Sequence, residues 1–399
     1  MRVGEWLRAR CTMLVLAGML LVGLGIRLVV LNIPGHYGDI AVTARWAENM
    51  ARYGPWDFYL HDGAVYPALL YFYWPLGALF HGDALLHAVK GLSIPFDLAL
   101  AIVLYLVARR LTNDRRALLA PAIYLFNPAV LLAGPIWGQV DAAGALAFVG
   151  ALWAVAEGRY PAAGALAVLS ALVKPQFGLV ALPVILLAIL QGRRGAGWRP
   201  LALSGLGALA AYVVVALPLR LTPALYLERV QYAGSLQPST SLNAPNPWGM
   251  LIGYKIPDGG LFWVGAALLV IGLAMALLPL SRRQDLVTIL AVGLFVVFAF
   301  YFLPTRVHER YLFPAMAVLA PLAAASWRVL GAYLILTVAF ALTIVYGLAA
   351  TTSFPLPPDL KHLLVQRTAV VWIGLTMLGV AATLVVLLVQ RPLRTEARS

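Results

Sequence analysis

The chain has 399 residues, of which 62% are hydrophobic and 11% are charged, and its mean hydropathy is +0.87. A soluble globular domain carries about 25% charged residues, so this composition excludes the ordinary soluble classes. The net charge of +13 would suit a nucleic-acid-binding protein, but an excess of basic residues in the cytoplasmic loops of a membrane protein explains it equally well. We therefore expect a membrane protein with no nucleic-acid partner.

Apolar stretches close to the ~20 residues that a spanning helix needs recur along nearly the whole sequence. This pattern predicts one all-α polytopic domain over residues 1–399, with no room for a large soluble domain. The expected spans are twelve, at about 11–31, 88–107, 117–132, 140–156, 161–173, 177–190, 200–219, 261–280, 286–303, 311–326, 329–349 and 369–390.

The charges indicate how these spans are oriented. With the N-terminus in the cytoplasm, seventeen arginines and five acidic residues fall on the cytoplasmic side, whereas basic and acidic residues balance on the outer side. This asymmetry predicts a multi-pass protein of the inner (plasma) membrane with both termini cytoplasmic. The first span is too long for a removable signal peptide, and the single cysteine, Cys11, excludes an intramolecular disulfide.

Two outer segments, about 32–87 and 220–260, are too long for simple turns, so function is expected there. The first is rich in Trp and Tyr, which favour the membrane interface. It predicts two interfacial helices, about 40–53 and 66–79, joined by a turn through Gly54 and Pro55.

Asp39 follows the first span and opens an amphipathic helix on which Thr43 and Trp46 share its face. It has two interpretations. A carboxylate there caps a helix N-terminus, although Val42 stands where a capping box would have Glu or Gln. The same carboxylate is a suitable general base for a sugar or lipid hydroxyl. The local sequence leaves both open.

Lys174 joins the short fifth and sixth spans, at a depth where a cation is costly unless it is paired or hydrated. Its alternative is a side chain that reaches back to the interface. Before the tenth span come Arg306, His308 and Arg310. The guanidinium groups of the two arginines suit phosphate oxygens. The alternative is a charged interfacial cap in which Glu309 only pairs an arginine.

Gln139 and Asp141 add an amide and a carboxylate at the outer end of the fourth span, where Asp141 either caps that helix or orients a basic partner. The sequence contains no phosphate-binding loop of the G-x-x-x-x-G-K-[ST] type, no H-E-x-x-H helix and no EF-hand pattern. An ATP-driven pump and a zinc protease are therefore not expected.

The order of these motifs resembles the GT-C superfamily of integral-membrane glycosyltransferases, over about residues 10–325. Within it, the chain is similar to bacterial mannosyltransferase-like relatives of the ER transferases that use dolichyl-phosphate sugars. The motifs that carry the resemblance are Gly38-Asp39 with Trp46, Tyr66-Pro67-Ala68-Leu69, Asp97, Asn127-Pro128, Trp137-Gly138-Gln139-Val140-Asp141, Lys174-Pro175-Gln176, Asn243-Ala244-Pro245-Asn246-Pro247-Trp248 and His308-Glu309-Arg310-Tyr311.

The resemblance implies inverting transfer of one hexose, mannose before glucose, from a polyprenyl-phosphate-linked donor to a lipid-linked or glycan acceptor on the extracytoplasmic face. It implies Asp39 as the catalytic base. The expected donor-phosphate ligands are Lys174, His308, Arg310 and Arg306, and the expected cavity residues are Tyr66, Trp137, Gln139, Asp141, Gln176, Asn243, Trp248 and Glu309. A single acidic residue replaces an Asp-x-Asp pair in the first-loop motif, which favours a transferase without a metal or other cofactor.

Two other functions fit the composition. A transporter or flippase of a lipid-linked saccharide would share a basic cavity and short helices, but it would not need Asp39 as a base, and we find no repeat of fixed period. A non-catalytic scaffold explains the bundle but not the ionisable residues at depth. Oligomeric state, acceptor and prenyl chain length are left open by the sequence.

Overall fold

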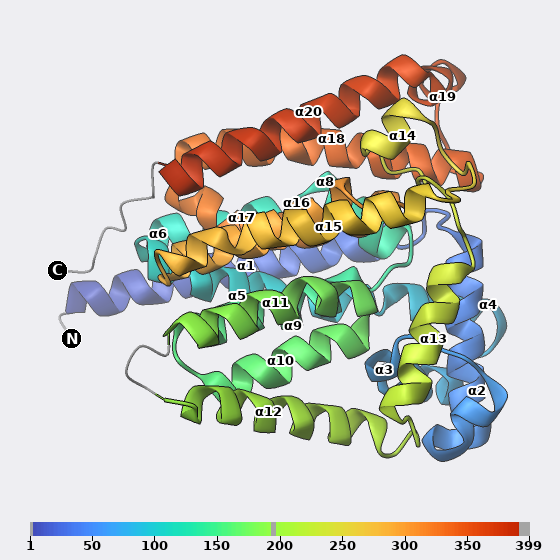
Figure 1. Cartoon of the computed structure of the whole chain (residues 1–399), viewed down its shortest axis with the longest axis horizontal. Helices are drawn as coiled ribbons and strands as arrows, with labels where there is room; N and C mark the ends of the chain where they lie inside the picture. The colour runs from blue at the N-terminus through green and yellow to red at the C-terminus, as the bar shows by residue number, and fades with distance from the viewer. Residues whose placement is uncertain (1–2, 193–196, 391–399) are drawn as a thin grey trace.

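The computed structural model describes residues 3–192 and 197–390. Within these ranges the chain is helical apart from loops and three isolated β-bridges. The helices run roughly side by side, and the described chain begins and ends at the same end of the bundle (Figure 1).

The centre of the bundle is built from helices that are apolar on all sides. α16 (Leu286–Phe302) and α17 (Phe313–Ala325) are buried over nearly their whole length. Around α17 pack α5 (Ser93–Leu111), α7 (Leu119–Leu125), α9 (Asp141–Ala156) and α18 (Trp327–Thr351). A helix without a polar face has to be buried or lie in lipid, so these sequences place themselves inside the bundle.

The remaining helices of the bundle enclose this centre. α1 (Val3–Val30) packs on α5 and α7, α15 (Leu261–Leu277) on α16, and α20 (Arg367–Val385) on α18. On the other side, α10 (Tyr160–Val173) contacts α9, α11 (Pro175–Gly192) and α12 (Arg199–Ala216). The short elements are α6 (Asp114–Ala117), α8 (Pro128–Leu131), η1 (Leu132–Ile136), η2 (Leu278–Ser281), η3 (Glu309–Leu312), α19 (Pro358–Val365) and η4 (Val386–Gln390).

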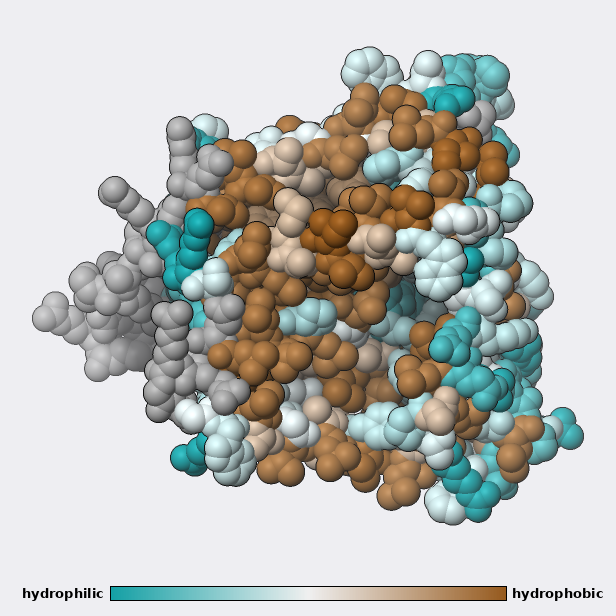
Figure 2. Space-filling view, viewed as in Figure 1, coloured by the Kyte–Doolittle hydropathy of each residue, from teal (hydrophilic) through white to brown (hydrophobic). Residues whose placement is uncertain are grey.

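The protein is a multi-pass membrane protein. Six helical segments are long and apolar enough to cross a bilayer, namely Arg10–Val30, Gly82–Leu111, Arg199–Ala216, Leu261–Ser281, Trp327–Thr351 and Arg367–Val389. Four shorter apolar helices accompany them, Asp141–Ala156, Tyr160–Val173, Pro175–Leu190 and Leu286–Phe302. Figure 2 shows the hydrophobic belt that these helices form across the middle of the molecule, with hydrophilic residues beyond it. Each predicted span coincides with a helical segment, and the count of twelve crossings stays a prediction.

Two predicted spans have different bounds in the structure. The second begins at Gly82, because α4 (Gly82–Gly91) leads directly into α5. The third is broken into the segments Asp114–Leu125 and Pro128–Ile136, which meet at 44°. The break lies at Asn127, whose side chain accepts hydrogen bonds from the backbone of α8 and so starts a new helix before Pro128.

The first outer segment contains α2 (Tyr37–His61) and α3 (Pro67–Leu79), where helices were expected. The break expected at Gly54 is present: Gly54 has a φ of 68° and a ψ of 174°, which a glycine tolerates, and α2 consists of two helices joined by a kink there. The expected connection to the second predicted helix at this point is wrong, because a further helical stretch continues to His61. The chain reverses after His61 instead, and α2 packs along α3.

The second outer segment carries α13 (Pro223–Ser235) and α14 (Pro247–Leu251). Its irregular part is tied to the loop before α17, because Leu242 and Asn243 form β-bridges with His308. Loops far apart in sequence therefore meet at the end of the bundle that also holds α2, α3 and α4 (Figure 1).

The opposite end of the bundle carries arginines at helix junctions, where Arg109 pairs with Asp114 at 2.9 Å and Arg110 with Glu157 at 3.3 Å. Other charges used for the predicted orientation lie outside the described residues: Arg2, Arg193, Arg194, Arg391, Arg394, Glu396 and Arg398. Arg27 is buried in α1 and pairs with Asp97 of α5 at 3.0 Å, so this motif carboxylate joins two helices.

Candidate active site

The segment before α2 docks on the loop between η1 and α9. The backbone N–H of His36 donates to the carbonyl oxygen of Trp137 at 3.1 Å, and the two rings stack with centroids 5.2 Å apart. His36 is also the N-cap of α2, because its Nδ1 accepts a hydrogen bond from the backbone N–H of Asp39. The interpretation of Asp39 as the cap is therefore wrong, and its carboxylate is free for other contacts.

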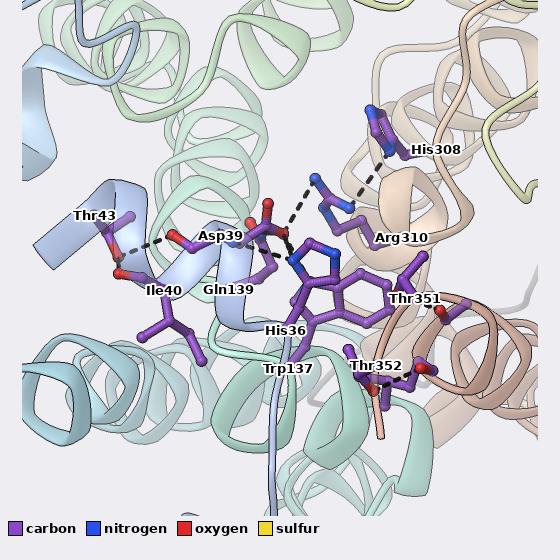
Figure 3. A network of polar contacts seen from close by, with 12 residues as sticks. His36, Asp39, Ile40, Thr43, Trp137, Gln139, His308, Arg310, Thr351 and Thr352 are labelled. Carbon is purple, nitrogen blue, oxygen red and sulfur yellow. Dashed lines mark hydrogen bonds and ion pairs between the residues drawn. The ribbon is translucent and has the colours of Figure 1, made fainter. Parts of the chain in front are cut away.

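Side chains from two other segments, the loop between η1 and α9 and the loop before α17, reach the Asp39 carboxylate (Figure 3). Trp137 Nε1 donates to Oδ2 at 2.8 Å and Gln139 Nε2 donates to the same oxygen at 2.5 Å. Arg310 Nη2 lies 3.7 Å and His36 Nδ1 3.5 Å from this oxygen. Burial raises the pKa of Asp39, but the charge of Arg310 and the other donors outweigh it and lower that pKa to about 2. The group is thus a carboxylate at neutral pH.

Lys174 lies at the break between α10 and α11 and is 1% exposed. Its Nζ donates to Gln139 Oε1 and to Asp141 Oδ1, both at 2.5 Å, and lies 5.4 Å from the ring centre of Tyr66. The alternative of a side chain that reaches to the interface does not hold, because Lys174 is buried and paired. Gln139 links this ammonium to Asp39, since its amide donates to one and accepts from the other.

Arg310 connects the same centre to the loop before α17. Its Nη1 donates to Glu309 Oε1 at 3.0 Å, and its guanidinium lies 5.4 Å from the ring centre of Trp137. Glu309 is buried and also accepts a hydrogen bond from Asn243 at 3.3 Å. His308 lies 3.5 Å from Arg310, and burial together with that cation lowers the pKa of His308 well below its ordinary value. His308 is therefore neutral at pH 7.

Four of these residues, Asp39, Gln139, Lys174 and Arg310, line one cavity of about 100 Å³. Its wall holds a base candidate, Asp39, and two cations, Lys174 and Arg310. Asp39 and Lys174 are 135 positions apart in the sequence, and Lys174 and Arg310 are 136 apart. The lining residues are Asp39, Val42, Thr43, Trp46, Tyr66, Leu69, Tyr73, Gly138, Gln139, Val140, Lys174 and Arg310. The described residues contain no group of three or more His, Cys, Asp or Glu side chains arranged to hold a metal ion.

Eight residues expected at the site do not line this cavity. Trp137, Asp141, His308 and Glu309 contact residues that do, and Asn243 contacts Glu309. The other three, Arg306, Trp248 and Gln176, lie elsewhere. Arg306 is bound to Asp258, with Nε to Oδ2 at 2.7 Å. Trp248 donates from Nε1 to the carbonyl oxygen of Leu303 at 2.8 Å. Gln176 lies half-buried in the first turn of α11. Arg306 and Trp248 hold outer loops together, and neither contacts Asp39.

Other carboxylates of the first outer segment are placed differently from Asp39. Asp62 pairs with Arg45 at 3.1 Å and lines a separate hollow of about 460 Å³ on another face of α2. Asp57 pairs with Arg220 at 3.5 Å, and Glu48 is exposed. Among the acidic residues of this segment, Asp39 lines the cavity with the two cations.

Two residues of the site were given no phosphate-binding or cavity role from the sequence, although Trp46 was placed on the helix face of Asp39. His36 holds Asp39 and Trp137 in register, and its position three residues before Asp39 is the spacing of an N-cap. Trp46 lines the cavity, and its spacing of seven residues from Asp39 predicts that both lie on one helix face.

The model for glycosyltransferase family 87 matches residues 66–304. No curated protein matches the chain. Among solved structures, ArnT from Cupriavidus metallidurans bound to undecaprenyl phosphate matches with a TM-score of 0.52 and 17% identity, over 98% of this chain and 73% of that one. At this identity the match shows a shared fold.

Two further structures match less well. ArnT from the same organism in the apo state has a TM-score of 0.48 and 17% identity, over 94% of this chain and 78% of that one. The oligosaccharyltransferase of Archaeoglobus fulgidus, tethered with an acceptor peptide, has a TM-score of 0.46 and 14% identity, over 92% of this chain and 55% of that one. The expected kinship with GT-C membrane glycosyltransferases is confirmed. The family match covers more than half of the chain, so this protein belongs to glycosyltransferase family 87.

Proposed function

We propose that the protein transfers one hexose, mannose before glucose, from a polyprenyl-phosphate-linked donor to a hydroxyl of a lipid-linked or glycan acceptor, with inversion at the anomeric carbon. The observation that carries this proposal is the joint cavity of Asp39, Lys174 and Arg310. It combines an ionised carboxylate with two cations, which are the groups that activation of a hydroxyl and departure of a phosphate require.

Asp39 is the base of the proposed reaction. Both hydrogen bonds that its carboxylate accepts from described residues end on Oδ2, which leaves Oδ1 for the acceptor hydroxyl. The acceptor oxygen attacks the anomeric carbon while its proton passes to Asp39, and the bond from that carbon to the phosphate oxygen breaks. The lipid phosphate leaves with the electron pair of that bond.

Lys174 and Arg310 are the proposed ligands of the leaving phosphate, with His308 beside Arg310. The cavity is smaller than the roughly 300–1,000 Å³ of ligand pockets, so side chains must move to admit a sugar phosphate. Arg310 is suited to this, because its Nε is buried and has no hydrogen-bond partner in the described ranges. When its charge turns to the phosphate, Asp39 loses a cation and becomes a stronger base.

The proposed location is the inner (plasma) membrane, with both termini cytoplasmic and the active site on the extracytoplasmic face. The fold shared with ArnT, solved with undecaprenyl phosphate, supports a polyprenyl-phosphate donor. We propose no metal or other cofactor. Arg306 and Trp248 act as structural ties in this proposal, and Asn243 acts through Glu309.

Replacement of Asp39 by Asn tests the proposal. We expect Asp39→Asn to abolish transfer from a short-chain polyprenyl-phosphate mannose or glucose while donor binding persists, because an amide keeps the shape but accepts no proton. Transfer is measured by product formation in detergent or liposomes, and inversion by the anomeric configuration of the product in NMR. Asp83→Asn, an exposed carboxylate at the start of α4, is the matched control.

If folded Asp39→Asn keeps most of the wild-type rate, Asp39 is not the base. Movement of an intact lipid-linked saccharide across liposomes by both wild type and Asp39→Asn, without transfer, would favour a transporter or flippase instead.

A further inference from the structure

Trp46 lines the cavity, but the reaction proposed above gives it no role. It lies in the middle of α2, two helical turns after Asp39 on the same face, and is 6% exposed. It lines the same 100 Å³ cavity as Asp39, Lys174 and Arg310. The edge of its ring meets the ring of Tyr66 at a centroid distance of 5.4 Å and an angle of 86°, so the indole is held between α2 and the start of α3.

The indole N–H of Trp46 is a buried donor without a partner among the residues that the structure describes. Three other indole N–H groups have acceptors: Trp137 donates to Asp39, Trp248 to the carbonyl oxygen of Leu303, and Trp153 to Glu157. Buried polar groups in native proteins are nearly always hydrogen-bonded, and an exception calls for an explanation. A ligand that supplies an acceptor gives one.

The arrangement of the cavity restricts what that acceptor is. In the proposed reaction the cations hold the phosphate and Asp39 faces the acceptor hydroxyl, so the transferred sugar lies between them. Its hydroxyl oxygens then face the remaining walls, which include Trp46. An indole N–H only donates, and a sugar hydroxyl has lone pairs to accept that hydrogen bond.

We propose that Trp46 Nε1 donates a hydrogen bond to a hydroxyl of the transferred hexose, which makes Trp46 a residue that determines sugar specificity. This inference rests on the proposed function. It adds the residue that recognises the sugar, which neither the base nor the phosphate ligands can do.

Trp46→Phe tests the inference because it removes the N–H and keeps an aromatic ring. With a polyprenyl-phosphate mannose donor, we expect kcat/KM to fall about 3- to 10-fold, the range of one neutral hydrogen bond. The measurement is repeated with donors that lack one hydroxyl each. The ratio of wild-type to variant kcat/KM should return to within about twofold of unity for one deoxy donor, because the lost hydroxyl is then the one that Trp46 binds.

Trp263→Phe on α15 is the matched control, since Trp263 is 73% exposed and should show wild-type kcat/KM with every donor. The Tm of the enzyme without donor shows whether the variant is folded. Trp46→Phe also removes part of a buried side chain, so loss of packing alone should lower its Tm, and the comparison of deoxy donors is what assigns the hydrogen bond.

The outcomes separate the two proposals. If the wild type transfers the sugar and Trp46→Phe does so at the same rate, the proposed function stands and the role of Trp46 is overturned. A reduced rate that no deoxy donor compensates, or that a deoxy acceptor compensates, also overturns it, because the bond then goes to the phosphate or to the acceptor. Absence of transfer by the wild type from any polyprenyl-phosphate hexose overturns the proposed function, and this inference with it.

Discussion

At the scale of single residues, the electrostatic balance at Asp39 is the feature with the clearest consequence. Burial raises the pKa of Asp39, and the charge of Arg310 lowers it, followed by His36 and the hydrogen bond from Trp137. The balance gives a pKa of about 2. A carboxylate with so low a pKa is fully ionised but a weak base, so the position of Arg310 controls how readily Asp39 takes a proton.

Arg310→Gln should therefore change the pH dependence of transfer. Wild-type kcat/KM should show no loss from protonation of Asp39 above about pH 4. Removal of the cation lets burial dominate, so the pKa of Asp39 rises, less of it is ionised at a given acidic pH, and the acid limb of kcat/KM moves to higher pH. The acid limb of kcat/KM should still be present in His36→Asn and His308→Asn backgrounds, because Asn does not titrate and Asp39 then accounts for the limb. An acid limb at the same pH in Arg310→Gln and wild type would contradict the electrostatic balance at Asp39.

Lys174 and Arg310 should act on the same phosphate. Lys174→Ala and Arg310→Ala are each expected to lower transfer, and their losses should not add in the double variant. Arg310→Lys keeps the charge without the bidentate fork, so it should cost about 1.5–3 kcal/mol in transition-state binding. Arg328→Lys is the control, since Arg328 is exposed at the start of α18, away from the cavity. Strictly additive losses in rate measurements would indicate separate roles.

At the scale of elements, the site depends on how two loops meet the first turn of α2. Gly138, between Trp137 and Gln139, has a φ of 96°, and a Cβ there would lie 2.7 Å from Ile40 Cγ1. The loop that supplies two donors to Asp39 therefore fits against α2 only with glycine at this position. The break at Lys174 has a similar effect, because the chain leaves α10 there and brings the ammonium to Gln139.

Gly138→Ala should disturb catalysis more than folding. It pushes Trp137 and Gln139 away from Asp39, and displacements near 1 Å lower rates on the order of 100-fold. Gly82→Ala has the matching backbone problem, with a φ of 54° but open space around its Cβ. We expect Tm to fall in both variants, further in Gly138→Ala because of the added contact with Ile40, and a large loss of transfer in Gly138→Ala alone. Equal activity of the two variants would show that the fit of this loop is unimportant.

At the scale of the whole molecule, α2 and α3, which carry part of the cavity lining, lie at the end of the bundle opposite to the ends of the described chain (Figure 1). Charged groups within the bundle are compensated, as the pair of Arg27 with Asp97 illustrates. A polar site at one end and arginine-rich helix junctions at the other are the arrangement that the positive-inside tendency favours.

This arrangement predicts which loops face the cytoplasm. In a Cys11→Ala background, a cysteine at Ser235, exposed at the end of α13, should react with an impermeant thiol reagent in intact spheroplasts. A cysteine at Ser281, exposed after α15, should react only once the membrane is permeabilised. Labelling of both from outside would contradict the orientation.

The sequence by itself determined the membrane class and the position of nearly every helix, because hydropathy and helix breakers act over a few neighbouring residues. It also supplied Asp39, Lys174 and Arg310 as candidates, since ionisable groups in an apolar chain are conspicuous. Only the tertiary structure decided that Gln139 joins Asp39 to Lys174 and that His36, not Asp39, caps α2. These outcomes depend on contacts between distant segments, which no local period encodes. For the same reason Arg306 and Arg310, four residues apart and alike in sequence, differ in the folded chain: one is bound to Asp258 and the other faces the cavity.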